Sequence, residues 1–252
     1  MKNSVVSALA TLTLLGLSTS ARAQSTQQAD SWNLSRIMMT NDLNGAVNPT
    51  PTVFPETGVW SFMQLPSIPS IPANNTAFTL LPSYTVNCLG SGATPPTFDC
   101  WQPVASPSSL PLIGVSAIAT VNFNNGFSNV DLIQGMTMLH PSPSHAAVVA
   151  WTSPAQQNVR ILGRVADVDN ACGDGVYWAV MRDLTPAVGS PVTGVVPYST
   201  TLNSATTFVA ANVPVLAGTR VYFVIQAGNP NTGALPDHYC DSTTLDVLIS
   251  KL

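Results

Sequence analysis

The chain has 252 residues, of which eight are Lys or Arg and twelve are Asp or Glu, so 8% are charged and the formal net charge is −4. So little positive charge, with no basic run, argues against binding to the phosphate backbone of a nucleic acid. The 21 Pro and 16 Gly, together with few Glu, Lys and Arg, favour many short strands joined by turns over long helices.

The first 23 residues have the features of a secretory signal peptide. Lys2 provides the positive start, Val5–Leu17 is apolar, and Ala21–Ala23 offers small residues for cleavage. We therefore expect a secreted or periplasmic protein whose mature chain, without residues 1–23, has 229 residues. No stretch reaches the ~18 consecutive apolar residues of a transmembrane helix, so no membrane span is expected. Loss of Lys2 and Arg22 lowers the net charge to −6.

Residues 24–30 are expected to form a mobile polar leader, and residues 31–252 a single domain. All-β sandwiches of ~200–250 residues are commonly one domain. A single Glu, Glu56, stands against eleven Asp. Asp favours turns because its short side chain accepts hydrogen bonds from nearby backbone N–H groups, so the acidic groups are expected on loops.

The predicted elements begin with residues 31–40, which hold no strict helical period and are interpreted as a strand. Residues 41–58 are expected to be a loop, residues 58–63 a strand, and residues 65–75, with prolines three apart, an extended surface strap. Short apolar runs separated by Gly, Pro and Asn turns then predict strands at 77–81, 84–86, 112–123, 130–139, 146–152, 159–166, 176–182, 192–196, 206–210, 221–226 and 245–249.

Polarity along these runs predicts how the strands are buried. Arg160 and Arg164 alternate with apolar residues within 159–166, so one face of this strand should be exposed to solvent. The run at 176–182 is apolar on both faces, as an inner strand would be. Three tryptophans in apolar runs are expected in the core: Trp60, Trp151 and Trp178. The strand spacing predicts an all-β fold, a single antiparallel β-sandwich of jelly-roll type.

The four cysteines form an even set, which allows three disulfide pairings. Sequence order favours Cys88–Cys100, which closes a 13-residue loop, and Cys172–Cys240, which closes a long one. Loop-closure entropy gives ~3 kcal/mol for the first and about 4 kcal/mol for the second. Free buried thiols are the alternative, but an oxidising compartment favours disulfides.

A series of short motifs resembles a jelly-roll, carbohydrate-binding-module-like domain that recurs in secreted bacterial proteins of undefined function. In chain order these motifs are WNL (32–34), GVWSF (58–62), FTLL (78–81), LPLIG (110–114), LHP (139–141), VVAWTSP (148–154), VRILGRVADVD (159–169), AGTRVYFVIQAG (217–228) and CDSTTLDVLI (240–249). The resemblance covers nearly all of the mature chain. It implies a jelly-roll fold and a carbohydrate ligand, and it brings no catalytic residue. This chain departs from the family pattern in its two cysteine pairs.

Acidic residues around Cys172 suggest a calcium site. A Cys172–Cys240 disulfide would draw the loop after residue 166 toward the segment before the last strand. Loop carboxylates and carbonyls can supply the six to eight oxygen ligands that Ca²⁺ takes. The expected ligands are Asp167, Asp169, Asp174 and Asp241. Alternatively, these residues only form turns, since the spacing is not that of an EF-hand.

Two aromatic residues are candidates for a sugar platform. Trp101 follows the first disulfide loop, and Tyr239 lies in the polar segment PDHYCD with Asp237 and His238, so both rings are expected to be exposed. An exposed ring can cover the apolar face of a pyranose while polar groups fix its hydroxyls. The alternative is that each ring is part of the core or is exposed without a ligand.

The sequence therefore favours a non-catalytic binding module for a glycan or another extracellular polymer. Its alternatives are a structural or adhesive extracellular protein and a hydrolase acting on polysaccharide. The three histidines, His140, His145 and His238, lack metal-ligand spacing, and no GxSxG motif is present. A glycan binder should present at least two surface aromatics on one face, whereas an adhesive protein should present an apolar patch or a free strand edge.

Overall fold

The computed structural model describes residues 30–50, 52–53, 56–57, 60–66, 78–183, 192–197, 204–228 and 237–252. The expected signal peptide, most of the expected leader and residues 67–75 of the expected strap lie outside these ranges. Within them, no helix combines the length and apolar character needed to span a bilayer.

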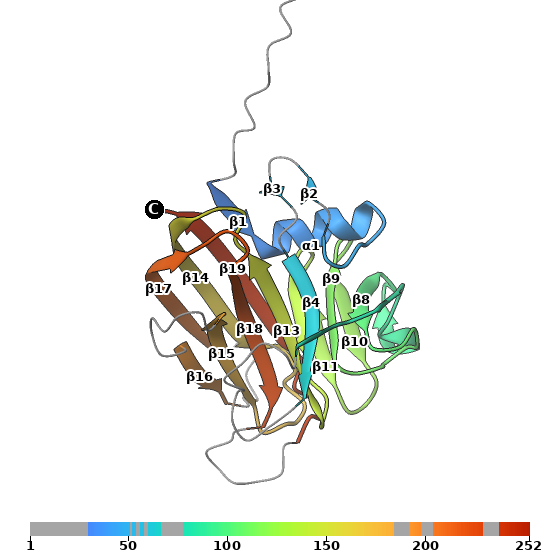
Figure 1. Cartoon of the computed structure of the whole chain (residues 1–252). Helices are drawn as coiled ribbons and strands as arrows, with labels where there is room; N and C mark the ends of the chain where they lie inside the picture. Colours follow the sequence, from blue (N-terminus) through green and yellow to red (C-terminus); the bar gives the residue numbers. More distant parts are fainter. Residues whose placement is uncertain are drawn as a thin grey trace, which may run out of the picture.

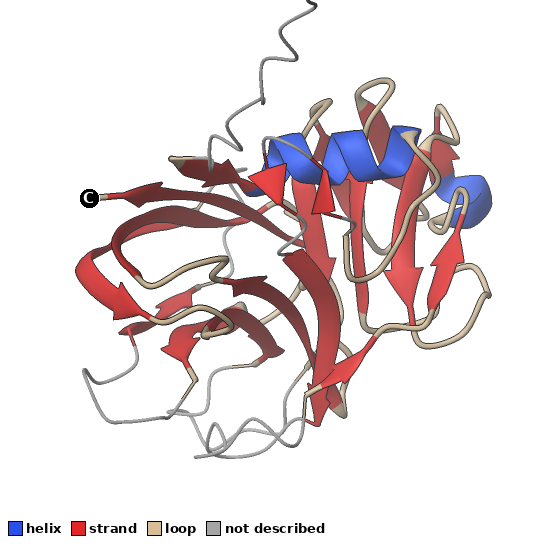
Figure 2. Ribbon diagram, turned by 45° about the horizontal axis from the view of Figure 1, so that its top comes forward, coloured by secondary structure: helices blue, strands red, loops and turns tan. Residues whose placement is uncertain are grey.

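Two antiparallel sheets face each other and form the body of the protein (Figures 1 and 2). The larger has the order β17 (Ala205–Val215), β14 (Gln157–Asp167), β19 (Thr243–Lys251), β12 (Thr137–His140), β9 (Leu112–Ser116), β8 (Phe98–Gln102) and β6 (Ser83–Thr85). In addition, β1 (Ser31–Asn33) pairs with β19. The second has the order β16 (Val192–Val196), β15 (Val176–Arg182), β18 (Arg220–Ala227), β13 (His145–Thr152), β4 (Trp60–Pro66) and β5 (Thr79–Leu80). The predicted antiparallel β-sandwich is confirmed.

Two smaller sheets complete the described strands. One has the order β11 (Asn129–Leu132), β10 (Val121–Asn124) and β7 (Ala93–Thr94), and the other pairs β2 (Thr52–Val53) with β3 (Glu56–Thr57). A 3-10 helix, η2 (Gly90–Gly92), precedes β7. The turn between β10 and β11 contains Asn125 and Gly126.

The main core lies between the two large sheets and contains the three predicted core tryptophans. The Trp151 ring has no exposed surface and lies 5.0 Å from the Trp32 ring, centroid to centroid. Alternation along β14 is as predicted, because Val159, Ile161 and Val165 are buried while Arg160 is exposed. The prediction of an inner strand at 176–182 is confirmed, since β15 lies between β16 and β18.

Residues 31–40 are not one strand, as the sequence predicted, but the short strand β1 followed by helix α1 (Leu34–Leu43). Asn33 is the N-cap: its side-chain oxygen accepts a hydrogen bond from the Arg36 backbone N–H at 2.9 Å. The helix lies across one end of the strands and packs against β9, β12 and β19 (Figure 2). Leu34 and Met38, four residues apart, form its buried face.

Two predicted strands are each divided by a turn. The run 112–123 becomes β9 and β10, and the run 130–139 becomes β11 and β12. Gly135, at φ +87°, allows the second turn. The prediction missed the first break because the apolar residues continue into it, and it missed the second although Gln134 and Gly135 interrupt the apolar run. As a result, the β10–β11 hairpin leaves the larger sheet and carries its Asn125–Gly126 turn toward the second disulfide.

Candidate functional site

Both expected disulfides are present, Cys88–Cys100 and Cys172–Cys240. The first is buried in a small apolar cluster between the larger sheet and the β10–β11 hairpin. The second joins the β14–β15 loop to the segment that leads into β19. The described part of the chain contains no free cysteine.

Three segments meet at the Cys172–Cys240 disulfide, and we call them together the disulfide surface: residues 125–129, 168–175 and 237–241. The Phe127 carbonyl oxygen lies 3.2 Å from the Cys240 sulfur and 3.7 Å from the Cys172 sulfur. Asp169 Oδ1 accepts a hydrogen bond from the Asn129 backbone N–H at 3.0 Å. The hairpin turn and the acidic loop are therefore held against each other.

The disulfide surface carries two exposed aromatic rings. Tyr239 is 66% exposed, as expected, and its ring lies 4.4 Å from that of His238. Phe127, which the sequence analysis did not single out, is 79% exposed. Asn125 Oδ1 accepts hydrogen bonds from the backbone N–H groups of Phe127 and Ser128, which fixes the turn beneath the ring. Among the described aromatic residues, only Tyr239 and Phe127 are exposed.

The expected exposure of Trp101 is wrong, because only 6% of its surface is accessible. Its ring packs near Phe62, at 6.1 Å, and Tyr84, at 5.2 Å between centroids. Strand β8 separates two apolar clusters: Trp101 points into the main core, and the preceding Cys100 points into the cluster around the first disulfide. Neither face of this strand is free for a ligand.

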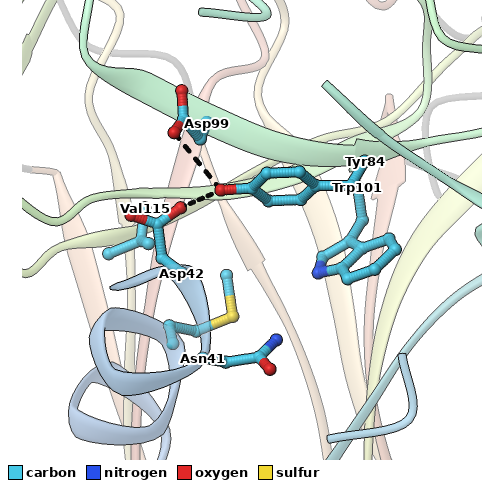
Figure 3. A pocket seen from close by; sticks show the side chains of 7 residues that line it. Asn41, Asp42, Tyr84, Asp99, Trp101 and Val115 are labelled. Atoms are coloured by element: carbon cyan, nitrogen blue, oxygen red, sulfur yellow. Dashed lines mark hydrogen bonds between the residues drawn. The ribbon is translucent and has the colours of Figure 1, made fainter. Parts of the chain in front are cut away.

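A polar recess lies beside Trp101 and is shown in Figure 3. The Tyr84 hydroxyl points between two carboxylates: it donates to Asp42, and Asp99 Oδ2 lies 3.2 Å away. Burial raises the pKa of Asp42, against the effect of the Tyr84 hydrogen bond. Burial also raises the pKa of Tyr84, so the phenol keeps its proton. The recess has a volume of ≈ 10 Å³, which is room for about one water molecule and too small for a sugar ring.

The four expected calcium ligands are distributed around the acidic loop. Asp167 Oδ1 accepts a hydrogen bond from the Asp169 N–H, and Asp169 Oδ1 accepts hydrogen bonds from Asn129 and Ala171. These two residues thus use carboxylate oxygens to form turns, as the alternative interpretation proposed. Across the described ranges, no three His, Cys, Asp or Glu side chains are grouped so that they could hold a metal by themselves.

Asp241 is also buried, at 2% exposure, but it differs from Asp167 and Asp169 because neither of its carboxylate oxygens has a hydrogen-bond partner. Burial, together with the charges of Asp174, Asp237 and Asp167, raises the pKa of Asp241 to about 9. The Gly228 N–H opposes this only weakly, without forming a regular hydrogen bond. Burial also raises the pKa of Asp174, as does the charge of Asp237. The carboxylates of this surface therefore repel one another.

His140 gives a testable pH dependence. Burial lowers its pKa to about 4 from 6.5, and His238 acts in the same direction, against the Pro141 carbonyl and Asp169. Because the unfolded chain takes up this proton at the higher pH, the contribution of His140 to the free energy of unfolding should fall as the pH falls from about 6.5 to about 4, whereas the raised pKa of Asp241 acts in the opposite direction over the same range. The expected contribution is about 3 kcal/mol. Urea titrations at several pH values measure it.

The variant His140→Gln removes the titrating ring, so the difference in the free energy of unfolding between parent and variant should change by about 3 kcal/mol from pH 6.5 to pH 4. His145→Gln, a change in a partly exposed histidine outside the disulfide surface, is the control and should leave the pH dependence as in the parent. An unchanged pH dependence in His140→Gln would contradict the assignment to His140.

No protein-family model matches the chain, and no curated protein matches its sequence. Among solved structures, it is similar to a family 61 carbohydrate-binding module in complex with β-1,4-galactotriose (11% identity, TM-score 0.31, covering 46% of this chain and 70% of the module). It is also similar to the C-terminal family 6 carbohydrate-binding module of a laminarinase from Zobellia galactanivorans (17% identity, TM-score 0.27, covering 46% and 80%).

A third similar structure is the enzymatically active domain of tailspike protein 4 of bacteriophage CBA120 (15% identity, TM-score 0.30), with 46% of this chain matching 15% of that protein. At these identities and TM-scores, the similarities do not assign a ligand to this chain.

Proposed function

We propose that the protein is a secreted, non-catalytic module that binds a glycan or another extracellular polymer through its disulfide surface. The observation that carries this proposal is the position of Tyr239 and Phe127, the only exposed aromatic residues of the described ranges: Tyr239 precedes Cys240 directly, and the main-chain carbonyl of Phe127 contacts the Cys172–Cys240 disulfide. The two disulfides support secretion, since such bonds persist in oxidising compartments.

The chemistry of the surface suits a sugar. An aromatic ring covers the apolar face of a pyranose, and neighbouring polar groups bind the hydroxyls. Asp237 and Asp174 are exposed next to Tyr239, and His238 is partly exposed beside its ring. Asp237 Oδ1 also accepts a hydrogen bond from the Tyr239 backbone N–H at 3.0 Å, which helps to fix the Tyr239 segment. A segment held in place before binding loses less conformational entropy when the ligand arrives.

Removal of either platform ring should weaken binding. For the glycan that a glycan array of the mature protein identifies, we expect Tyr239→Ala and Phe127→Ala each to lower the affinity at least tenfold, or about 1.4 kcal/mol. Titration calorimetry measures this. The control is Ile118→Ala: Ile118 is 63% exposed and lies between β9 and β10, at the opposite end of the β10–β11 hairpin. Binding that is insensitive to both ring substitutions, or no binding to any glycan, would overturn the proposal.

The adhesive alternative is supported by one observation, the edge strand β17. This 11-residue strand without charged side chains pairs with β14, and its other side has no partner among the described strands. Val209 on this strand is 55% exposed. However, Asn212 at φ +56° and Pro214 interrupt the regular edge, which weakens it as a template for another strand. A concentration-dependent increase in molar mass, without glycan binding, would favour this alternative.

A further inference from the structure

The starting point is the carboxylate of Asp241, which follows Cys240 directly. It is 2% exposed, and neither oxygen accepts a hydrogen bond. A buried carboxylate normally has hydrogen-bond donors or a positive charge next to it, because removal from water without compensation is costly. The negative charge of Asp241 is therefore neutralised either by a bound proton or by a ligand from outside the protein.

Oxygen atoms converge beside Asp241 at Gly173. A Cβ atom placed on Gly173 would lie 3.0 Å from the carbonyl oxygen of Tyr239, and 3.5 Å from both the Cys240 carbonyl oxygen and Asp241 Oδ1. Three consecutive residues thus each place an oxygen within 3.5 Å of one point beside Gly173. Gly173, at φ +113°, leaves this space without a side chain.

The charges around this space are negative. Asp174 and Asp237 are near enough to Asp241 for their charges to act on it. All six Lys and Arg residues of the expected mature chain lie in the described ranges, and none of them is among the groups that act on Asp241. The space beside Asp241 therefore has several oxygen atoms that could bind a cation and an excess of negative charge, and no Lys or Arg side chain acts on Asp241.

We propose that Asp241 binds a Ca²⁺ ion together with the main-chain carbonyls of Tyr239 and Cys240 and the carboxylates of Asp174 and Asp237. Calcium takes six to eight oxygen ligands in flexible geometry and accepts main-chain carbonyls, whereas Mg²⁺ demands near-ideal octahedral geometry. Zinc and copper favour nitrogen or sulfur, and both nearby cysteines are oxidised.

This ligand set differs from the one expected from the sequence. Asp174 and Asp241 are kept, but Asp167 and Asp169 have turn-forming roles instead. Because no three carboxylate, imidazole or thiol side chains in the described ranges are grouped to hold a metal, the carbonyls are an essential part of the site. The exposed side chains of Asp174 and Asp237 complete it by moving toward the ion. The site does not depend on glycan binding, although it would also hold the Tyr239 segment in place.

The test measures calcium binding by the mature, disulfide-bonded protein after treatment with EDTA and dialysis. Titration calorimetry should give one Ca²⁺ per chain, and Ca²⁺ in excess should raise the melting temperature by several degrees. Dissociation constants of roughly 10⁻⁴–10⁻³ M are typical of extracellular calcium modules. Mg²⁺ at the same concentration should raise the melting temperature much less.

Three acid-to-amide variants locate the ion. Asp241→Asn should abolish binding, and Asp174→Asn, at an exposed position, should weaken it at least tenfold even if Asp241→Asn fails to fold. Asp131→Asn removes one exposed carboxylate from β11 and should bind as the parent does. The proposal is overturned by no calcium binding, by an equal response to Mg²⁺, by full binding in Asp241→Asn or Asp174→Asn, or by equal weakening in Asp131→Asn.

Discussion

Trp151→Ala is expected to lower the free energy of unfolding by about 3–5 kcal/mol, the range for truncating a fully buried tryptophan. Trp151 has no exposed surface, pairs in register with Trp60 of the neighbouring strand, and packs against Trp32 of β1. The ring therefore links the two sheets, and its loss leaves a cavity that the rigid strands cannot fill. For a chain of this size the melting temperature should fall by roughly 6–20 °C.

Urea titration followed by circular dichroism measures this loss independently of tryptophan fluorescence. Trp151→Phe keeps an aromatic ring in the same space and should lose clearly less stability. Ile118→Ala, at an exposed site, should stay within about 0.5 kcal/mol of the parent. A loss in Trp151→Ala no larger than that in Ile118→Ala would show that the two sheets do not depend on this contact.

The second large effect concerns the Cys172–Cys240 disulfide, whose two residues are 68 positions apart. Replacing both cysteines by serine should cost about 4 kcal/mol in the chain-entropy account, against ~3 kcal/mol for the pair Cys88 and Cys100, which are only 12 positions apart. Non-reducing thermal and urea unfolding compares the two double variants.

The two double variants should also differ in function. The variant without Cys172 and Cys240 loses the bond that joins the acidic loop to the Tyr239 segment, so we expect it to lose glycan and calcium binding. The variant without Cys88 and Cys100 leaves the disulfide surface intact and should bind both once it is folded. The same loss of binding in both variants would show that the effect is one of general destabilisation.

Local order along the chain was sufficient to predict much of the sandwich. Alternation of Val159, Ile161 and Val165 with polar residues fixes which face of β14 is buried, because successive strand residues point to opposite sides. Cysteine order predicted both disulfides, and polar surroundings predicted the exposure of Tyr239. Helix α1 was missed because its buried apolar residues, Leu34 and Met38, are too few to establish a helical period.

The sequence by itself determined the β-sandwich class, the pattern of buried faces and the two cysteine pairs, since these depend on residue type, spacing and order. Only the tertiary structure decided that Trp101 is buried and that Phe127 and Tyr239, 112 positions apart, are exposed beside the same disulfide. It also separated the turn-forming Asp169 from the unpartnered Asp241. The physical reason is that burial and hydrogen bonding of a loop residue are set by whichever distant segment packs against it.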